Sequence, residues 1–226
     1  MKLLRHLPNL LTCLNLVCGC LGIVNALEGA ADQAVWYVIG ACVFDFFDGF
    51  AARALHVSSP IGKELDSLAD MVSFGVLPSL VMFRMIDTLS PSVYLPYSAF
   101  LLAVFSALRL AKFNVDENQK ESFIGLPTPA NALFITSLVY LRSPFDSLIS
   151  QDFLLVGITL AFSFLLIAPV ELFALKFKTF SWTDNKLKFT FLAFSVLVLA
   201  IGQLSALPFV ILTYVAVSLL KHVFSL

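Results

Sequence analysis

Long apolar runs dominate this sequence and restrict what it can fold into. Hydrophobic residues make up 59% of its 226 residues, charged residues only 13%, and the mean hydropathy is +0.93. A soluble domain is nearer ~45–50% apolar, whereas about 20 consecutive apolar residues can cross a bilayer as a helix. The candidate runs span about 7–27, 33–55, 65–88, 92–111, 129–142, 152–175, 188–204 and 206–223. We therefore predict an all-α polytopic membrane bundle of about eight transmembrane helices, forming a single domain over residues 1–226.

The rest of the composition argues against several classes of protein. A formal net charge of -1 predicts no nucleic-acid partner. The cysteines lie in apolar runs at spacings that fit neither a zinc site nor a disulfide framework, so we interpret them as small packing residues: Cys13, Cys18, Cys20 and Cys42. The first apolar run is longer than the ~7–15 residues of a signal-peptide core and no AxA-like cleavage site follows it. We expect it to be a retained helix.

Four carboxylates interrupt the apolar pattern at Asp45, Asp48, Asp66 and Asp70. Near a bilayer centre each would cost roughly 2.5–3.5 kcal/mol, so something must compensate them. Spacings of three and four residues place each pair on one face of a helix, and the segment 56–60, which ends in proline, separates the two helices. Carboxylates that converge in a low-dielectric site need a cation, and hard oxygen ligands suit Mg²⁺ or Mn²⁺. We predict a divalent-metal site with two ions.

Small residues and one arginine accompany these acids. Gly49 and Ala52 flank the first acidic pair, and Gly62 precedes Asp66 by one turn. Each allows a backbone or a bulky ligand to approach closely. Arg53 lies near the predicted helix break, where its guanidinium is well placed to bind a phosphate.

Together these residues form a recognisable motif, DxxDGxxARx8GxxxDxxxD. It is filled at every fixed position, by Asp45, Asp48, Gly49, Ala52, Arg53, Gly62, Asp66 and Asp70. The pattern resembles the signature of the CDP-alcohol phosphatidyltransferases. The resemblance implies that an alcohol attacks the phosphatidyl phosphorus of CDP-diacylglycerol and that CMP leaves. It also implies that Asp45, Asp48 and Asp66 are chiefly metal ligands, that Asp70 ligates the second ion and serves as the general base, and that the protein is a homodimer.

The first turn of the 7–27 run has two interpretations. Asn9 and Thr12 are polar residues one turn apart at a helix start, where they either cap the helix or both cap it and bind the nucleotide. Ser59 likewise is either a turn residue or a ligand contact. The residues that the resemblance places on CDP-diacylglycerol are Pro8, Asn9, Leu10, Leu11, Thr12, Gly49, Ala52, Arg53, Ser59 and Gly62.

Two flanking stretches bear on the acceptor alcohol. DSLADMVSFG at 66–75 and the segment 109–130 resemble the serine-using branch of the family, although a lysine stands at 112 where arginine is commoner. Arg109 and Lys112, three residues apart at a cytoplasmic helix end, either hold the carboxylate of L-serine or extend to the membrane interface. The predicted serine-binding residues are Arg109, Lys112, Asn114 and Gly125.

Two other functions are open on this sequence. The same chemistry with glycerol 3-phosphate or an inositol phosphate would have to bind a dianion, for which we would expect more cationic residues near the acids. A cation transporter would place its site near the midplane between repeated halves, whereas no internal repeat is visible here. We therefore favour transfer to serine.

The basic residues predict how the chain is oriented. With a cytoplasmic N-terminus, all of the 14 Lys and Arg residues except Arg84 and Arg142 fall on the cytoplasmic side, in accord with the positive-inside rule. At about 1.5 Å per residue, Asp45 is reached from outside after about 15 Å of a core about 30 Å thick, and Asp70 lies about 10 Å beyond Lys63. We expect both termini to be cytoplasmic, the active site to lie in the cytoplasmic leaflet, and the protein to reside in a prokaryotic cell (inner) membrane among lipids.

Overall fold

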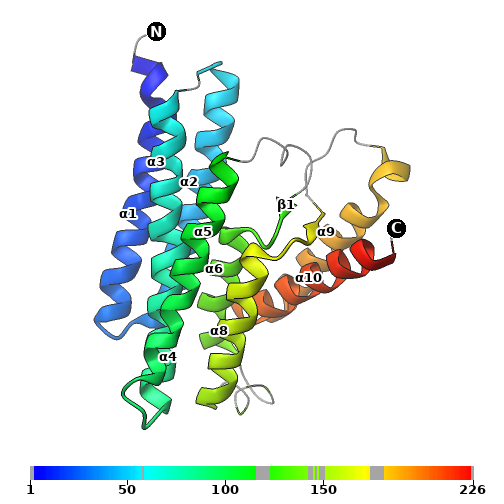
Figure 1. Cartoon of the computed structure of the whole chain (residues 1–226). Helices are drawn as coiled ribbons and strands as arrows, with labels where there is room; N and C mark the ends of the chain where they lie inside the picture. Colours follow the sequence, from blue (N-terminus) through cyan, green and yellow to red (C-terminus); the bar gives the residue numbers. More distant parts are fainter. Residues whose placement is uncertain are drawn as a thin grey trace.

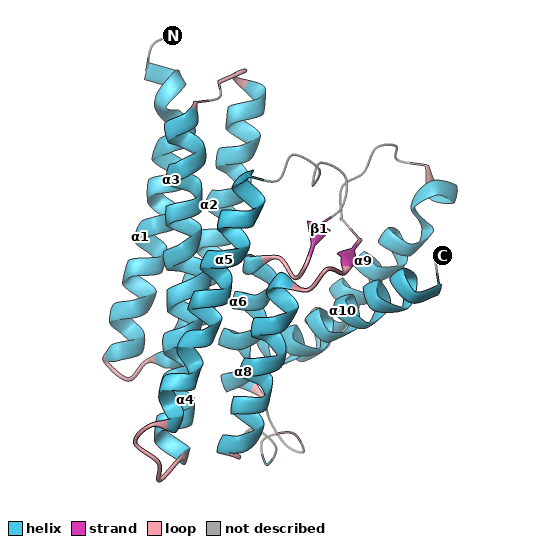
Figure 2. Ribbon diagram, in the orientation of Figure 1, coloured by secondary structure: helices cyan, strands magenta, loops and turns pink. Residues whose placement is uncertain are grey.

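The computed structural model describes residues 3–57, 59–115, 123–141, 145, 147, 151–173 and 181–224. These residues fold as helices with one two-stranded pairing (Figures 1 and 2). The helices are α1 (Leu7–Leu27), α2 (Ala34–Ala54), α3 (Pro60–Asp70), α4 (Leu77–Leu89), α5 (Leu101–Val115), α6 (Thr128–Ser137), α8 (Asp152–Ile167), α9 (Trp182–Gly202) and α10 (Leu207–Phe224). Strands β1 (Phe123–Ile124) and β2 (Glu171–Leu172) pair antiparallel. The predicted all-α class is confirmed.

Within the described residues, five helical segments are long and apolar enough to cross a membrane. They are Leu7–Leu27, Ala31–Ala54, Pro60–Leu89, Leu95–Val115 and Asn185–Lys221. The apolar helix α8, with 16 residues, and α6, with 10, are shorter. The chain is an integral membrane protein, and the count of about eight spans stays a prediction. Several residues that entered the predicted topology lie outside the described residues: Lys2, Lys120, Arg142, Lys176 and Lys178.

One narrow face of α1 makes its contacts with the rest of the bundle. That face carries small and polar residues three or four positions apart, namely Pro8, Thr12, Asn15, Gly19, Gly22 and Ala26. A Cβ atom on Gly19 would collide with Ser73, and one on Gly22 would collide with Leu77. Small residues of this kind let helix backbones approach closely inside a membrane. The remaining faces of α1 are largely exposed, as expected for a helix against lipid.

The predicted break between the two acidic helices is confirmed. Helix α2 ends at Ala54, and His56 adopts a positive φ of 52° that ends the helical path. Ser59 then caps α3, because its Oγ accepts a hydrogen bond from the backbone N–H of Gly62 at 3.0 Å. Pro60 occupies the first helical position, where its missing N–H is not needed.

The expected continuous helix over 65–88 is interrupted by a π-helical segment, Met71–Val76, between α3 and α4. Its wider turn starts directly after Asp70. Ser73 in this segment donates a hydrogen bond from Oγ to the backbone oxygen of Asn15 at 2.9 Å, and Gly75 lies against Ser106 of α5. The periodicity of apolar residues does not distinguish this turn from α-helix, so only the folded backbone reveals it. Such bulges occur frequently at functional sites.

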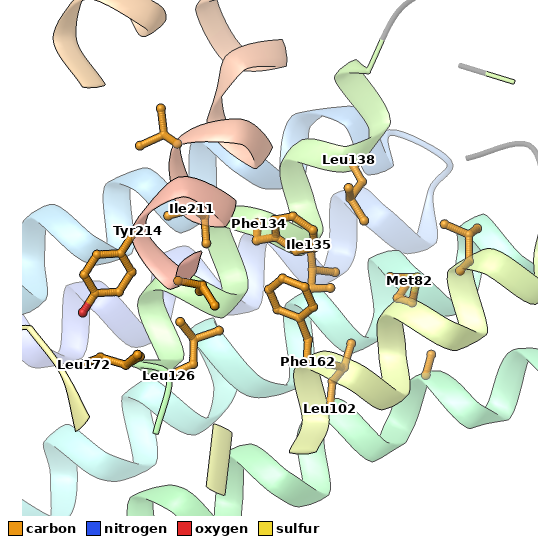
Figure 3. Packing of buried hydrophobic residues seen from close by; sticks show 14 of the residues in the cluster. Met82, Leu102, Leu126, Phe134, Ile135, Leu138, Phe162, Leu172, Ile211 and Tyr214 are labelled. Carbon is orange, nitrogen blue, oxygen red and sulfur yellow. The ribbon is translucent and has the colours of Figure 1, made fainter. Parts of the chain in front are cut away.

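The larger of the two apolar clusters among the described residues brings together residues of α4, α5, α6, α8 and α10 (Figure 3). The rings of Phe134 on α6 and Phe162 on α8 stack with centroids 3.9 Å apart. Tyr214 of α10 reaches this core and donates its hydroxyl to the backbone oxygen of Phe173 at 3.0 Å. Helices α9 and α10 lie side by side and incline away from the common direction of α1 to α8 (Figure 1).

Candidate metal and substrate site

Three of the four predicted metal ligands converge. Asp45 and Asp48 come from α2 and Asp66 from α3, and one carboxylate oxygen of each lies within 4.8 Å of the other two. Asp48 is buried, and the other two are half-buried. Among the described residues, no lysine or arginine forms an ion pair within 4.0 Å with any of the three acids.

These residues fit a divalent cation. A cluster of carboxylate oxygens is the ligand set that hard ions such as Mg²⁺ and Mn²⁺ prefer. Oδ1 of Asp66 is buried and has no hydrogen-bond partner among the described residues. Buried acceptors are normally paired, so this atom indicates a missing ligand. The three acids could therefore hold a metal ion, as the sequence predicted.

Asp70 lies one turn beyond Asp66 on α3 and is only 9% exposed. It is not a member of the three-carboxylate group. Its Oδ1 accepts a hydrogen bond from Nδ2 of Asn15 on α1 at 3.0 Å. Sequence reasoning missed Asn15. The available signal was a carboxamide three residues after Thr12, on the same face of an apolar helix.

The first turn of α1 also reaches the acids. Thr12 is buried, and its Oγ1 donates a hydrogen bond to Oδ2 of Asp48 at 2.6 Å. The same hydroxyl lies 3.1 Å from the backbone oxygen of Pro8. His6 is the N-cap of α1 and makes no side-chain cap bond. The capping interpretation of Asn9 and Thr12 is therefore wrong, because both lie inside the helix rather than at its cap.

The other residues predicted to contact the nucleotide lipid occupy the ends of α1, α2 and α3. Arg53 is exposed, and its guanidinium is folded toward Gly49. A Cβ atom added at Gly49 would lie 3.5 Å from Nη1 of Arg53. Gly62 lies against Asn9 and Ser59. A Cβ atom added at Gly62 would be 3.1 Å from both Oδ1 of Asn9 and Oγ of Ser59. Pro8 is buried, whereas the half-buried or exposed members of the set are Asn9, Leu10, Leu11, Ala52, Ser59 and Gly62.

Two of the four predicted serine-binding residues line a cavity of about 410 Å³. Its lining comprises Arg109, Lys112, Val115, Ile124, Leu166, Ile167 and Pro169. Arg109 is only 8% exposed, and its Nε has no partner among the described residues. It lies close enough to Asp70 for an electrostatic interaction. Arg109 thus connects this cavity with Asp70 of the acidic site.

The other two have contacts of a structural kind. Nδ2 of Asn114 donates to Oγ of Ser67 at 2.8 Å, and its backbone oxygen accepts from Nζ of Lys63 at 2.6 Å, which ties α5 to α3. Gly125 has a φ of +77° and donates its N–H to the oxygen of Val170 at 2.9 Å. A Cβ on Gly125 would collide with the backbone of Leu166. Neither residue is among those that line the cavity.

Comparison with known proteins extends this picture. A family model described as CDP-alcohol phosphatidyltransferase matches residues 5–169. Over 146 residues the chain is 36% identical to a CDP-diacylglycerol–serine O-phosphatidyltransferase of Bacillus subtilis, covering 62% of this chain and 79% of that protein. The Helicobacter pylori (strain J99) protein of the same name is 36% identical over 143 residues, 62% of this chain and 60% of the relative.

An archaeal relative matches a longer part of the sequence. The archaetidylserine synthase of Methanothermobacter thermautotrophicus is 33% identical over 174 residues, which cover 73% of this chain and 68% of that protein. The chain thus spans less than two thirds of the Helicobacter relative and more than two thirds of the archaeal one. The family match includes α1 to α8 and every carboxylate of the acidic hairpin. From this match and these relatives, the chain belongs to the CDP-alcohol phosphatidyltransferase family.

Proposed function

We propose that this protein transfers the phosphatidyl group of CDP-diacylglycerol to the hydroxyl of L-serine, giving phosphatidylserine and CMP. The observation that carries the proposal is the convergence of Asp45, Asp48 and Asp66 within 4.8 Å, beside a cavity lined by Arg109. The relatives reported above are named for transfer to serine or for archaetidylserine synthesis. Their names support serine over a phosphorylated acceptor.

The metal site would be formed by the acids of α2 and α3. Asp45, Asp48 and Asp66 would hold one Mg²⁺ or Mn²⁺, and Asp70 would contribute to a second. When bound there, such ions would supply positive charge to the diphosphate and to the departing CMP. Arg53, exposed beside Gly49 near the end of α2, would bind the nucleotide phosphates, and the first turn of α1 would line the nucleotide pocket.

Asp70 is the residue that we assign as general base. The serine hydroxyl attacks the phosphatidyl phosphorus; the new Oγ–P bond forms as the P–O bond to CMP breaks, and the hydroxyl proton passes to Asp70. Because Oδ1 already accepts a hydrogen bond from Asn15, we assign the proton to Oδ2. Burial of Asp70 keeps water away from the reacting groups.

The cavity beside Asp70 would receive the amino acid. Arg109 offers an Nε that has no partner among the described residues, and Lys112 offers an ammonium group; together they can bind the carboxylate of serine. Leu166, Ile167 and Pro169 contribute apolar surface to the same cavity. Because the carboxylates of the acidic site oppose the charge of these two cations, we expect this region to accept the single carboxylate of serine more readily than the dianion of glycerol 3-phosphate.

Membrane placement follows from the same site. A soluble amino acid and a lipid-borne nucleotide can both reach acids that lie in the cytoplasmic leaflet, and the distribution of Lys and Arg supports cytoplasmic termini. We further propose a prokaryotic cell membrane as the location and, from the family resemblance, a homodimer as the assembly.

Measurement of CMP release tests the function directly. Purified full-length protein receives CDP-diacylglycerol and Mn²⁺ or Mg²⁺, together with L-serine, glycerol 3-phosphate or inositol phosphate in parallel. We expect CMP release with L-serine alone, formation of phosphatidylserine, and loss of both in excess EDTA. Release with a phosphorylated acceptor but not with serine would refute the choice of acceptor. Full activity in EDTA would refute the metal site.

A second measurement tests the role of Asp70. Replacing Asp70→Asn keeps the shape of the side chain but removes the base, so we expect turnover to be abolished while CDP-diacylglycerol still binds. An Asp70→Asn protein that is fully active would overturn the assignment of the base.

A further inference from the structure

Asn15 carries a carboxamide on the buried face of α1, whose opposite face presents mainly apolar residues to lipid. Its side chain is fully buried (0% exposed), and Nδ2 lies 3.0 Å from Oδ1 of Asp70, which is 55 residues away in sequence. Its backbone oxygen accepts a hydrogen bond from Oγ of Ser73 at 2.9 Å. Asn15 therefore contacts the chain on both sides of the point where α3 becomes the π-helical segment.

A purely structural role explains this residue poorly. Nδ2 of Asn15 is satisfied by Asp70, but Oδ1 is buried without a partner among the described residues. A buried unpaired acceptor is destabilising by an amount similar to the gain from the one hydrogen bond. An apolar side chain of similar size would fill the same space without an unpaired acceptor of its own, although Oδ1 of Asp70 would then lose its donor. What the carboxamide adds is a directional N–H aimed at one carboxylate oxygen.

The rest of α1 holds that N–H in place. Gly19, one turn after Asn15, approaches Ser73 so closely that a Cβ there would collide with it. One turn before Asn15, Thr12 donates in the same way to Asp48 at 2.6 Å. Thr12 and Asn15 are three residues apart and so share a helix face. Through them α1, which carries no acid of the motif, contacts one carboxylate from each acidic pair.

We propose that Asn15 is a positioning residue for phosphatidyl transfer. By donating Nδ2–H to Oδ1 of Asp70, it fixes the plane of that carboxylate so that Oδ2 faces the acceptor hydroxyl. This inference rests on the function proposed above, in which Asp70 is the base. A partner that orients a reacting or ligating group typically changes activity or metal affinity by about 10- to 100-fold when it is removed.

The test compares two asparagines of the same helix. Asn15→Leu removes the hydrogen bond to Asp70. Asn25→Leu is the matched control, because Nδ2 of Asn25 also makes a 3.0 Å contact with another helix, to the hydroxyl of Tyr37, but at the end of α1 remote from the acids. For each full-length variant, CMP release with serine gives kcat and both KM values, Mn²⁺ affinity is measured by electron paramagnetic resonance, and thermal unfolding reports folding.

We expect kcat of Asn15→Leu to fall about 10- to 100-fold, with KM for CDP-diacylglycerol within about twofold of wild type and with the variant still folded at the assay temperature. Mn²⁺ affinity should fall in this variant and stay unchanged in Asn25→Leu. If Asn15→Leu does not fold, Asn15→Ala, which cannot overfill the site, should show the same loss of kcat.

Two outcomes would overturn the inference. One is a folded Asn15 variant with kcat and Mn²⁺ affinity both near wild type; the other is an equal loss of kcat in Asn25→Leu. Failure of the proposed function is recognised separately, because the wild-type protein would then release no CMP with serine. In that case the Mn²⁺ measurement still reports whether Asn15 acts on the acidic site.

Discussion

The two halves of this bundle are packed by different means. Around α1 to α4, helices meet through glycine, serine and other small or polar residues, as where Gly19 faces Ser73. Around α6, α8 and α10, they meet through rings and branched aliphatic chains, as in the stacked pair of Phe134 and Phe162 (Figure 3). Charged groups must converge in the first half, which requires backbones to come close, whereas the second half fills space with side chains.

The boundary between the halves, which we call the seam, comprises Arg109 of α5 and the segment 123–126, and it lies beside the proposed serine cavity. The chain returns from α5 to α6 through β1 and Gly125, whose N–H bonds Val170, while Leu126 donates its N–H to Leu165 at 2.9 Å. Arg109 of α5 extends into the cavity at this seam. We therefore expect substitutions in the first half to affect catalysis more than stability, and substitutions in the second half to affect stability more than catalysis. Substitutions at the seam should affect binding of the acceptor alcohol.

The largest effect is expected at the acids. Asp66→Asn removes one charge from the metal ligands, and a bound metal ion contributes several kcal/mol of transition-state stabilisation, so CMP release should fall about 10³-fold or more. The unfolding temperature should hold or rise, because an uncompensated buried charge is lost. Asp87→Asn, on the partly exposed end of α4, is the control and should retain activity. If Asp66→Asn strongly lowered the unfolding temperature but left the rate of CMP release unchanged, the division between the halves would be contradicted.

A substitution in the aromatic core should have the opposite profile. Phe162→Ala deletes a buried ring that stacks on Phe134, and truncations of this kind reduce stability by about 3–5 kcal/mol. Unfolding in detergent should report this loss, while kcat below the unfolding temperature should stay within about twofold. Phe164→Ala provides the control. That ring is exposed on α8, so its removal should change the free energy of unfolding by less than about 1 kcal/mol. A loss of kcat in folded Phe162→Ala would show that the second half shapes the chemistry.

At the seam, Arg109→Leu should impair recognition of the acceptor. A hydrogen bond between charged groups contributes about 1.5–3 kcal/mol, so KM for serine should rise roughly 10- to 100-fold while KM for CDP-diacylglycerol changes little. Arg84→Leu is the control, because Arg84 pairs with Asp87 away from the cavity and should leave both constants unchanged. An unaltered KM for serine in Arg109→Leu would remove the carboxylate-binding role.

The smallest effect is expected at the helix break. Ser59→Ala removes the cap of α3 and should lower stability by about 1 kcal/mol, and Ser59→Asp should restore it by accepting the same N–H of Gly62. Thermal unfolding measures both. If Ser59 also contacts the nucleotide lipid, KM for CDP-diacylglycerol will rise in Ser59→Ala beyond what the stability change explains; a turn residue will leave it unchanged. The measurement thereby resolves the two interpretations of this serine.

Local patterns were enough to predict much of this protein. Runs of apolar residues located the helices, and the proline at 60 located the break between α2 and α3. The three-residue interval between Asp45 and Asp48 placed both on one face of α2, and the break before Pro60 predicted that the helix carrying Asp66 could turn back toward them. These features depend on neighbours within a few residues, so the linear order of side chains contains them.

Other features arise between residues that are remote in sequence, and these came only from the folded chain. The hydrogen bond from Asn15 to Asp70 joins residues 55 positions apart, and the π-helical segment Met71–Val76 contacts both α1 and α5. Asn114 is bound to Ser67 rather than placed at the cavity. Periodicity specifies which face of a helix is buried but not which helix that face meets, since this depends on packing of the whole bundle.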